Sequence, residues 1–246
     1  MAYYLKFLFI AVILLQGAVQ ASDKVRVAVH IEPPAEDFVD NKFVGRNVEV
    51  ARTLVAAMGK EVQFTQCPFA RCFSMLQKGH VDMLIGLRKT KDRLKTISFL
   101  SEPMYYQHFP LRFYVNTKNA IKIESYEDLE DLSIGVLRGG TYFERFDQDK
   151  ELMKIEVATH KQLVNMLRKK RIDTFPEREE SVLPWINKAN YDVEFSLAKY
   201  QYDEAVASYI GISKKSPFNA EIEAFSATLQ KLKASGKHQA LFADIE

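Results

Sequence analysis

The sequence predicts an α/β fold built from two similar lobes, and a repeated segment is the main observation behind this prediction. Residues 75–83 (MLQKGHVDM) and 166–174 (MLRKKRIDT) share one pattern, in which the last turn of a helix leads into a short apolar strand. Each copy follows an extended apolar run, at 62–65 and 155–158, and a helical stretch. Two copies of one strand–helix–strand unit predict two lobes with a cleft between them, and clefts are where small ligands bind.

The first half of the chain alternates between strands and helices. Alternating apolar residues at 25–29 predict a strand, and Glu32-Pro33-Pro34 ends it because proline restricts the residue before it. Apolar residues at helical spacing predict a helix at 47–58, which Gly59 terminates. The elements predicted next are strand 62–65, helix 69–78, strand 81–87 and a short helix capped by Thr90 that runs through residue 94.

The second half continues this alternation and then returns toward the first lobe. An aromatic run at 109–115 predicts the strand that leaves the first lobe, and residues 205–212 predict the segment that crosses back. Residues 219–232 predict an amphipathic helix whose apolar face needs a sheet to cover. The other predicted elements are a short helix 126–132, strand 133–137, a tight turn 138–141 into a helix, the repeat, strand 193–197 and a short helix 238–242. Strands alternating with helices are typical of lobes with mostly parallel sheets.

The composition is that of one or two ordinary globular lobes. The chain has 246 residues, of which 47% are hydrophobic and 27% charged, and its net charge is +2. Acidic and basic residues are interspersed, so no charged patch or tail indicates a nucleic-acid partner. No metal motif or cofactor fingerprint is visible, so we expect neither a metal nor a cofactor.

The N-terminus has the layout of a secretory signal. Lys6 precedes an apolar run at 7–15, and Val19 and Ala21 place small residues before a cleavage point after residue 21. We therefore predict that residues 1–21 are a signal peptide and that the mature protein is exported to the periplasm. The alternative is an uncleaved anchor, although the apolar run is short for a membrane span.

Cys67 and Cys72 both lie in the exported part of the chain. An even pair of cysteines in an exported protein favours a disulfide, which here would close a small loop and stabilise it locally. Two free thiols are the alternative. Zinc binding is disfavoured because no second Cys or His pair has ligand spacing.

Two predicted strand-to-helix turns are suited to bind an anion. Residues 86–93 and 137–141 each offer backbone N–H groups and the positive end of a helix dipole, which favour a carboxylate. Arg93 can hold a carboxylate with two parallel N–H donors, and Gly140 allows close approach of the backbone. The plainer interpretations are that Arg93 is a solvated helix residue and that the glycine pair marks an ordinary turn.

Several segments, taken in order, resemble a known family. They are CPFARC at 67–72, LQKGHVD at 76–82, TKDRLK at 90–95, FLSEPMYY at 99–106, YEDL at 126–129 and IGVLRGGT at 134–141. This series is similar to the family 3 bacterial extracellular solute-binding proteins, the periplasmic receptors of polar amino acid ABC transporters. The resemblance implies a type II periplasmic-binding-protein (Venus-flytrap) architecture. It implies a first lobe of 22–112 plus 204–246, a second lobe of 116–203, and two crossover segments.

The resemblance also implies which residues bind the ligand. Arg93, three residues after a threonine, matches the arginine that holds the α-carboxylate, Thr141 matches a second-lobe threonine, and Phe69 matches a residue that packs on the ligand. Gly86 and Arg88 stand where the family has small hydroxyl residues, which is a departure from the pattern.

The largest departures concern the charge of the site. Arg178 stands where the family has an acidic partner for the α-amino group, with Glu177 beside it. A cation there would repel an ammonium, so either Glu177 takes that role or the ligand is not a standard α-amino acid. Glu32, where an aromatic residue is common, would suit a cationic group, whereas Arg88 and Arg178 would suit a second carboxylate.

The function that the resemblance implies is binding without catalysis. We expect a monomeric periplasmic receptor that closes on a small carboxylate ligand, an amino acid or a related compound, and then engages an inner-membrane ABC permease or a sensor. The first alternative is an enzyme on the same fold, a dehydratase of cyclic carboxylic acids with Glu177 or Glu180 as proton donor. The second alternative is an orphan ligand sensor.

Overall fold

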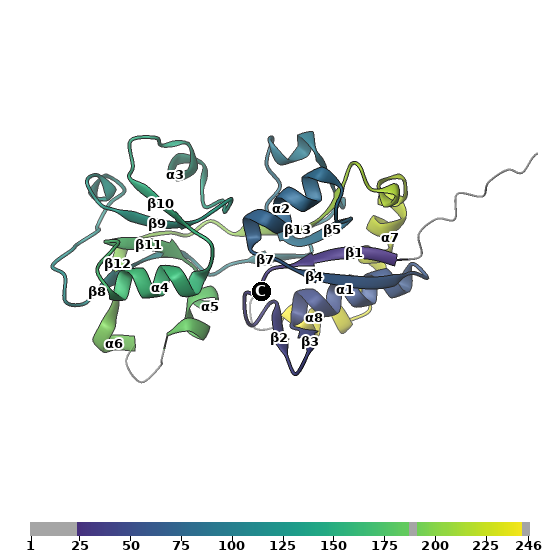
Figure 1. Ribbon diagram of the computed structural model, residues 1–246, viewed down its shortest axis with the longest axis horizontal. Helices are drawn as coiled ribbons and strands as arrows, with labels where there is room; N and C mark the ends of the chain where they lie inside the picture. The colour runs from purple at the N-terminus through teal and green to yellow at the C-terminus, as the bar shows by residue number, and fades with distance from the viewer. Residues whose placement is uncertain (1–23, 187–190, 243–246) are drawn as a thin grey trace, which may run out of the picture.

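The computed structural model of the protein describes residues 24–186 and 191–242, and it contains two α/β lobes side by side (Figure 1). The predicted signal peptide lies outside the described residues. In the first lobe the strand order is β4 (Glu61–Gln66), β1 (Lys24–Val29), β5 (Met83–Leu87), β13 (Val206–Ser213) and β6 (Ile97–Phe99), and β7 (Tyr105–Gln107) also pairs with β13. In the second lobe it is β10 (Lys154–Val157), β9 (Ile134–Leu137), β11 (Thr174–Glu177), β8 (Leu111–Asn116) and β12 (Phe195–Tyr202).

The two sheets are mixed rather than mostly parallel. Strand β1 pairs in parallel with β4 and β5, and β9 pairs in parallel with β10 and β11, as the repeat predicts. Every pairing that involves β8 or β13 is antiparallel. These are the two strands that follow the crossovers between the lobes, and they enter their sheets from the side of the other lobe.

The repeated segment forms the same corner in both lobes. Helix α2 (Phe69–Lys78) leads into β5, and α4 (His160–Arg168) leads into β11. Between helix and strand, the Asp82 carboxylate accepts a hydrogen bond from the backbone N–H of Arg26 at 2.9 Å, and Asp173 accepts one from Ser133 at 2.9 Å. Each aspartate thus ties its strand to the start of the neighbouring parallel strand, which explains why both copies of the repeat contain one.

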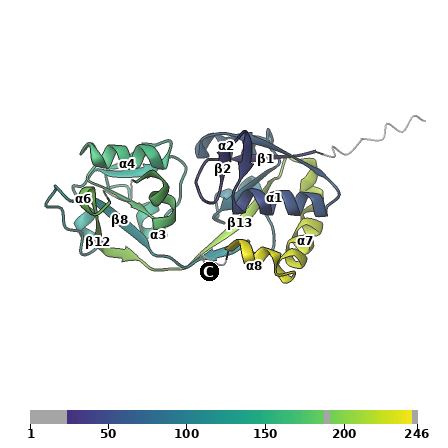
Figure 2. The ribbon, with the colours of Figure 1, turned by 90° about the horizontal axis from the view of Figure 1, so that it is seen from below.

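Helices cover both faces of each sheet, because alternate residues of a strand point to opposite sides (Figure 2). In β1, Val25 and Val27 pack toward α1 (Arg46–Ala57), α7 (Ile222–Ala234) and α8 (Lys237–Phe242), whereas Ala28 packs toward α2. In β8, Phe113 packs toward α3 (Glu144–Gln148), and Tyr114 packs toward α4 and α5 (Glu179–Val182).

Several predicted elements have different bounds or types, including the short helix predicted to run from Thr90 through residue 94, which is the 3-10 turn η1 (Arg93–Lys95). The strand predicted at 193–197 begins only at Phe195, because the residues before it form α6 (Tyr191–Glu194). The helix predicted at 126–132 is a single 3-10 turn, η2 (Glu127–Leu129). The helix predicted at 219–232 starts with the 3-10 segment η5 (Pro217–Glu221) before α7. A further 3-10 turn, η3 (Leu183–Trp185), follows α5.

A hairpin that the sequence analysis missed follows the proline pair. Its strands are β2 (Asp37–Val39) and β3 (Lys42–Val44). The two residues at the turn, Asp40 and Asn41, have φ values of 50° and 59°. Asp and Asn tolerate positive φ, and a two-residue loop with both residues in that region is a favoured hairpin turn. The Asp-Asn pair was therefore a usable local signal.

The crossover segments connect β7 to β8 and β12 to β13 (Figure 1). The first lobe was predicted to extend to residue 112, but β8 begins at Leu111 and pairs Arg112 with both Glu177 and Gln201 of the second sheet. Leu111 is buried in the core of the second lobe. Residues 111 and 112 therefore lie with the second sheet, slightly earlier than predicted.

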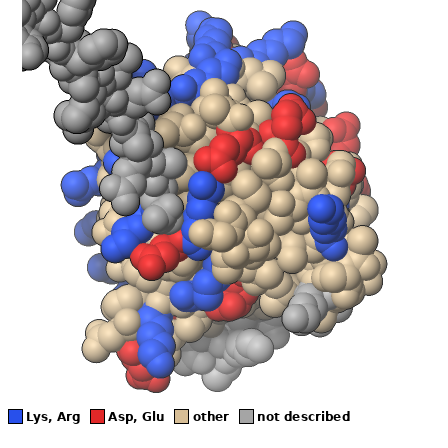
Figure 3. All heavy atoms as spheres, turned by 90° about the vertical axis from the view of Figure 1, so that its right-hand side faces the viewer, with Lys and Arg blue, Asp and Glu red and all other residues tan. Residues whose placement is uncertain are grey.

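The end face of the first lobe carries both signs of charge (Figure 3). Lys and Arg side chains lie among Asp and Glu side chains, and neither sign covers this face, in keeping with a net charge of +2. Among the helices within 24–186 and 191–242, none has the length and apolar character needed to cross a membrane.

Candidate functional site

A pocket lies between the two lobes, at the carboxyl ends of strands from both sheets. This is the edge at which ligands bind in open α/β sheets. Part of the lining comes from the ends of β1 and β5 in the first lobe and of β9 and β11 in the second, and the helices α1, α2, α4 and α5 contribute further side chains. All nine residues predicted to bind the ligand line it, namely Arg93, Thr141, Phe69, Glu32, Arg88, Gly86, Gly140, Glu177 and Arg178. Their contact with a ligand stays a prediction.

Arg93, the first residue of η1 (Arg93–Lys95), lies inside the pocket and is 5% exposed, so it is not a solvated helix residue. Its Nη1 donates to the backbone O of Arg88 at 3.0 Å, and its Nη2 donates across the cleft to Gly139 O at 3.1 Å. Its guanidinium lies 4.9 Å from the Phe73 ring centroid and 5.9 Å from that of Phe69. Desolvation lowers the pKa of Arg93 to about 10. A guanidinium has five N–H donors, so donors remain for a ligand.

Neither anion-binding turn has the helix dipole that was predicted for it. Residues 86–93 lead only into the three-residue η1, and α3 is a five-residue helix that begins three residues after Thr141. Helices this short have little dipole. At the first turn, Thr90 Oγ1 instead accepts a hydrogen bond from Arg93 N at 3.3 Å and so positions the arginine. At the second turn, the N–H of Gly140 is already bonded to a backbone carbonyl at 2.9 Å.

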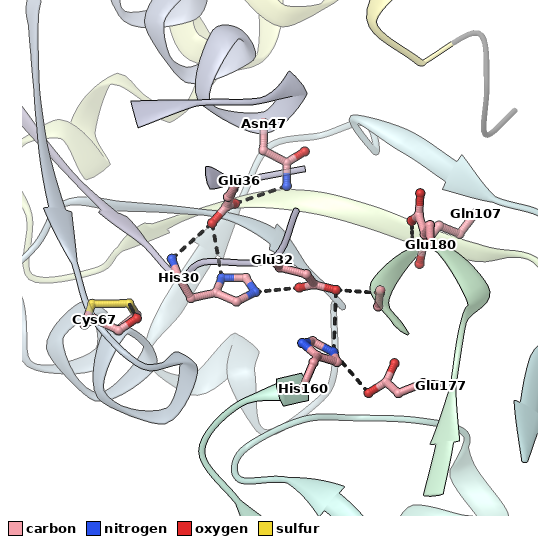
Figure 4. Close-up of polar contacts among 11 residues, drawn as sticks. His30, Glu32, Glu36, Asn47, Cys67, Gln107, His160, Glu177 and Glu180 are labelled. Carbon is pink, nitrogen blue, oxygen red and sulfur yellow. Dashed lines mark hydrogen bonds and ion pairs between the residues drawn. A yellow bond between two sulfur atoms is a disulfide. The ribbon is translucent and has the colours of Figure 1, made fainter. Parts of the chain in front are cut away.

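A chain of polar contacts centred on Glu32 crosses the pocket (Figure 4). His30 Nε2 lies 2.7 Å from Glu32 Oε2, and Ser181 Oγ of the second lobe donates to Glu32 Oε1 at 2.6 Å. His160 Nε2 lies 3.8 Å from Glu32 Oε1 and 3.3 Å from Glu177 Oε1. Burial favours a raised pKa for Glu32, but the charge of His160 and the contact with His30 outweigh it and hold the pKa well below its usual range. Glu32 is therefore an ionised link between the lobes.

His30 is enclosed by two carboxylates of the first lobe (Figure 4). Besides its contact with Glu32, its Nδ1 lies 3.2 Å from Glu36 Oε2, and its backbone N donates to the same oxygen at 3.1 Å. Asn47 Nδ2 donates to the other Glu36 oxygen at 3.1 Å. Desolvation favours a lowered pKa for His30, yet the charge of Glu36 and the contacts with both carboxylates raise it to about 10. His30 is therefore a cation in the wall of the pocket.

Two further arginines of the wall differ in their partners. Arg46, at the start of α1, reaches across the cleft to Glu180, with 2.9 Å between Nη2 and Oε2. Gln107 donates to the other Glu180 oxygen at 2.6 Å. Arg178 is 5% exposed, and its Nε donates to Phe109 O at 3.1 Å, but its buried Nη2 has no hydrogen-bond partner among the described residues. The pocket therefore contains a guanidinium with a donor to spare.

Three residues that line the pocket were not predicted from the sequence, namely His160, Arg46 and Ser181. A signal for His160 was available in the repeat. His160 lies six residues before Met166, and Phe69 lies six residues before Met75, so the two residues hold equivalent positions at the starts of α4 and α2. The pocket role predicted for Phe69 therefore extends to His160 by the internal symmetry of the chain.

The predicted disulfide between Cys67 and Cys72 is confirmed. It encloses the first turn of α2, including Phe69. The ring of Phe69 packs edge-on against the His30 imidazole, with 5.1 Å between centroids. The disulfide thus stabilises the part of the wall against which His30 and Arg93 rest.

Comparisons with solved structures agree with this architecture. An ancestral arginine-binding protein bound to arginine has 21% sequence identity and a TM-score of 0.76, with 92% of this chain and 99% of that chain covered. An arginine transport system periplasmic binding protein from Legionella pneumophila has 17% identity and a TM-score of 0.73, with 90% and 98% covered. An amino acid ABC transporter substrate-binding protein from Streptococcus pneumoniae bound to L-arginine has 22% identity and a TM-score of 0.72, with 91% and 97% covered. At these identities the likeness shows the fold. No curated protein matches the chain by sequence.

Two α/β lobes around a charged pocket, joined by two crossovers, define a two-lobed solute-binding protein. The family description that matches the sequence is "Bacterial extracellular solute-binding proteins, family 3", over residues 25–244. The chain therefore belongs to this family, which confirms the predicted family and fold.

Proposed function

We propose that this protein captures a small carboxylate-bearing ligand between its lobes and presents it to an ABC permease of the inner membrane. The observation that supports this most directly is Arg93, which is buried in the pocket between the lobes and keeps donors for a further partner. Arginine and a carboxylate form parallel charge-assisted hydrogen bonds, and burial strengthens them because the charges are less screened.

Contacts between the lobes suggest how a ligand controls closure. Three contacts each join a residue of one lobe to a residue of the other. They are Arg93 to Gly139 O, Ser181 to Glu32, and Arg46 to Glu180. A ligand that touches both lobes adds its binding energy to the closed state but not to the open state. It therefore shifts the population toward the closed form, which the permease would recognise.

The similar solved structures support the same class of ligand. Two of them are bound to arginine, and the third is a periplasmic binding protein of an arginine transport system. Amino acids carry the carboxylate that we assign to Arg93. We further propose that this protein is exported to the periplasm and acts there as a monomer.

We propose no catalytic step for this protein. The two glutamates considered as proton donors are each engaged by a cation of the protein. Glu177 lies 3.3 Å from His160, and Glu180 lies 2.9 Å from Arg46. A general acid must contact its substrate in the protonated form. These two carboxylates instead pair with basic side chains of the pocket wall.

The test is titration calorimetry of the exported protein with a panel of amino acids and simple carboxylic acids. We expect at least one to bind, and we expect Arg93→Ala to weaken it about 100-fold, as for loss of a buried charge-assisted contact. Lys91→Ala is the matched control, because Lys91 is exposed two residues away. Binding that survives Arg93→Ala unchanged, or a panel with no binder, would refute the proposal.

A further inference from the structure

The carboxylates that line the pocket already have cations of the protein as partners. The pairs are Glu32 with His30 (2.7 Å), Glu177 with His160 (3.3 Å) and Glu180 with Arg46 (2.9 Å). Burial favours a lowered pKa for His160, but the charges of Glu177 and Glu32 outweigh it and raise the pKa above its ordinary value. Both carboxylates therefore favour the protonated form of the imidazole, and each of the three carboxylates has a basic partner before a ligand arrives.

Three arginines of the same pocket have no such partner. Within the described ranges, no carboxylate lies within 4.0 Å of Arg88, Arg93 or Arg178. Arg93 and Arg178 donate only to backbone carbonyls, and Arg178 Nη2 is buried without a partner. The half-buried Arg88 makes no side-chain hydrogen bond to the residues described. Among the charged side chains that the structure describes in this pocket, those without a partner of opposite charge are therefore all arginines.

The positions of these arginines favour a ligand that carries more than one negative charge. Desolvation and the charge of Arg178 together lower the pKa of Arg88 to about 10, so the two guanidiniums lie near enough to repel each other. The carboxylates whose charges act on Arg88 are Asp147 and Glu177. With Glu36 behind His30 and Asp147 included, the described residues around the pocket comprise six basic groups and five carboxylates, so basic groups outnumber acidic ones. A buried excess of charge is costly until an opposite charge compensates it.

The location suited to a ligand's ammonium is taken by the protein. His160 Nε2 lies between Glu177 Oε1 at 3.3 Å and Glu32 Oε1 at 3.8 Å. An α-amino group that approached either carboxylate would meet the imidazole that lies between them, and in its protonated form, which both carboxylates favour, the imidazole would repel the ammonium. The next residue along the chain from Glu177 is Arg178, which adds a second repulsion.

We infer that the ligand is a small dicarboxylate without an amino group, with one carboxylate held by Arg93 and the second held by Arg88 and Arg178. This inference rests on the proposed function, since it specifies the ligand of the same pocket. Two carboxylates place negative charge beside the three guanidiniums that have no carboxylate of the described residues within 4.0 Å. They also accept a hydrogen bond from the unpartnered Nη2 of Arg178. Their binding requires no contact with Glu177 or Glu32.

The first experiment compares matched ligands by calorimetry on the wild-type exported protein. The series are succinate, succinamate and L-aspartate, and glutarate, glutaramate and L-glutamate. We expect a dicarboxylate to bind at least about tenfold more tightly than its mono-amide, in which one charge is lost, and more tightly than its amino acid. Tighter binding of the amino acid or of the mono-amide, or binding of L-arginine with no dicarboxylate binding, would overturn the inference and leave the proposed function standing. Failure of every carboxylate would reject both.

The second experiment assigns the two carboxylate positions. Arg88→Gln and Arg178→Gln should each weaken the dicarboxylate about 10- to 100-fold and should change the affinity of its mono-amide far less. Lys91→Gln is the exposed control and should alter neither affinity. The readout is the ratio of the two affinities within each variant, so a variant that is merely less stable does not mimic the effect. Equal losses for both ligands would contradict the assignment.

A third variant tests the role of His160. His160→Gln removes the basic group between Glu177 and Glu32 and leaves room for a ligand's ammonium. We expect the ratio of L-glutamate to glutarate affinity to rise by about tenfold or more, because like-charge repulsion is replaced by attraction. An unchanged ratio would mean that His160 does not exclude amino acids, and the inference would fail.

Discussion

The protonated state of His30 leads to a prediction about stability and pH. The folded protein holds the pKa of this imidazole at about 10, against an ordinary value of about 6.5 in an unfolded chain. Its stabilising contribution is therefore complete below about pH 6.5 and is lost as the pH rises toward about 10. Within that window one proton is released on unfolding. The free energy of unfolding should then fall by about 1.4 kcal/mol per pH unit on account of this group, or about 2 kcal/mol between pH 7.5 and 9.

Urea denaturation followed by circular dichroism, at several pH values in this window, measures the slope. His30→Gln should make the slope shallower by about 1.4 kcal/mol per pH unit, apart from any loss of stability common to all pH values. His80→Gln is the matched control, because His80 is exposed at the end of α2 and makes none of these contacts. The reasoning is refuted if the slope of His30→Gln equals that of the wild type, since His30 would then not be a cation in the folded state.

Three more predictions concern the walls of the pocket. Arg46→Gln removes the ion pair with Glu180 between the lobes, so calorimetry should show ligand affinity reduced about tenfold through a less favourable closed state. Replacement of Cys67 and Cys72 by serine should lower the free energy of unfolding in urea by about 2 kcal/mol. The expected loss is small because the disulfide closes a short loop and so removes little conformational entropy from the unfolded chain. Gly45→Ala should destabilise by about 2 kcal/mol or more in the same assay, because Gly45 has a φ of 112° and a Cβ would lie 2.4 Å from Ala35 O.

Each of these predictions has an outcome that contradicts it. Undiminished affinity in Arg46→Gln would mean that the ion pair does not favour closure. An unchanged urea midpoint after loss of the disulfide would show that the loop needs no covalent closure. For Gly45, the comparison is Gly59→Ala, where φ is also positive at 69° but no atom lies within 4 Å of the added Cβ. Equal losses at the two glycines would remove the steric argument and leave only the backbone cost of about 1 kcal/mol.

The parts of the fold that the sequence predicts well are those with strong local signals. Helix α2 has the predicted bounds, because Pro68 precedes its first turn and Gly79 ends it in the left-handed region at a φ of 77°. Strand β12 was placed two residues too early, because its start depends on pairing with β8, where Phe195 lies opposite Asn116. Pairing partners so far apart in the chain leave no local pattern.

The same contrast applies to the candidate site. Arg93 and its neighbours were found because a motif surrounds them in the sequence. The pair between Arg46 and Glu180 was not found, since 134 residues separate its members and only the approach of the lobes brings them together. The predicted dipoles at the two turns failed for a related reason, because the lengths of η1 and α3 are decided by packing rather than by the residues at the turn.

The position of β13 has a consequence for how the chain folds when its N-terminus emerges first. This strand, near the end of the sequence, is an interior strand of the first sheet, between β5 and β6, whereas the strands of the second sheet all fall within 111–202. A chain that emerges from its N-terminus can therefore complete the second lobe while the first still lacks this interior strand. Until residue 213 appears, the edges of β5 and β6 stay unpaired and open to aggregation. Pulse proteolysis of chains truncated before β13 should accordingly find the second lobe protected and the first lobe cleaved.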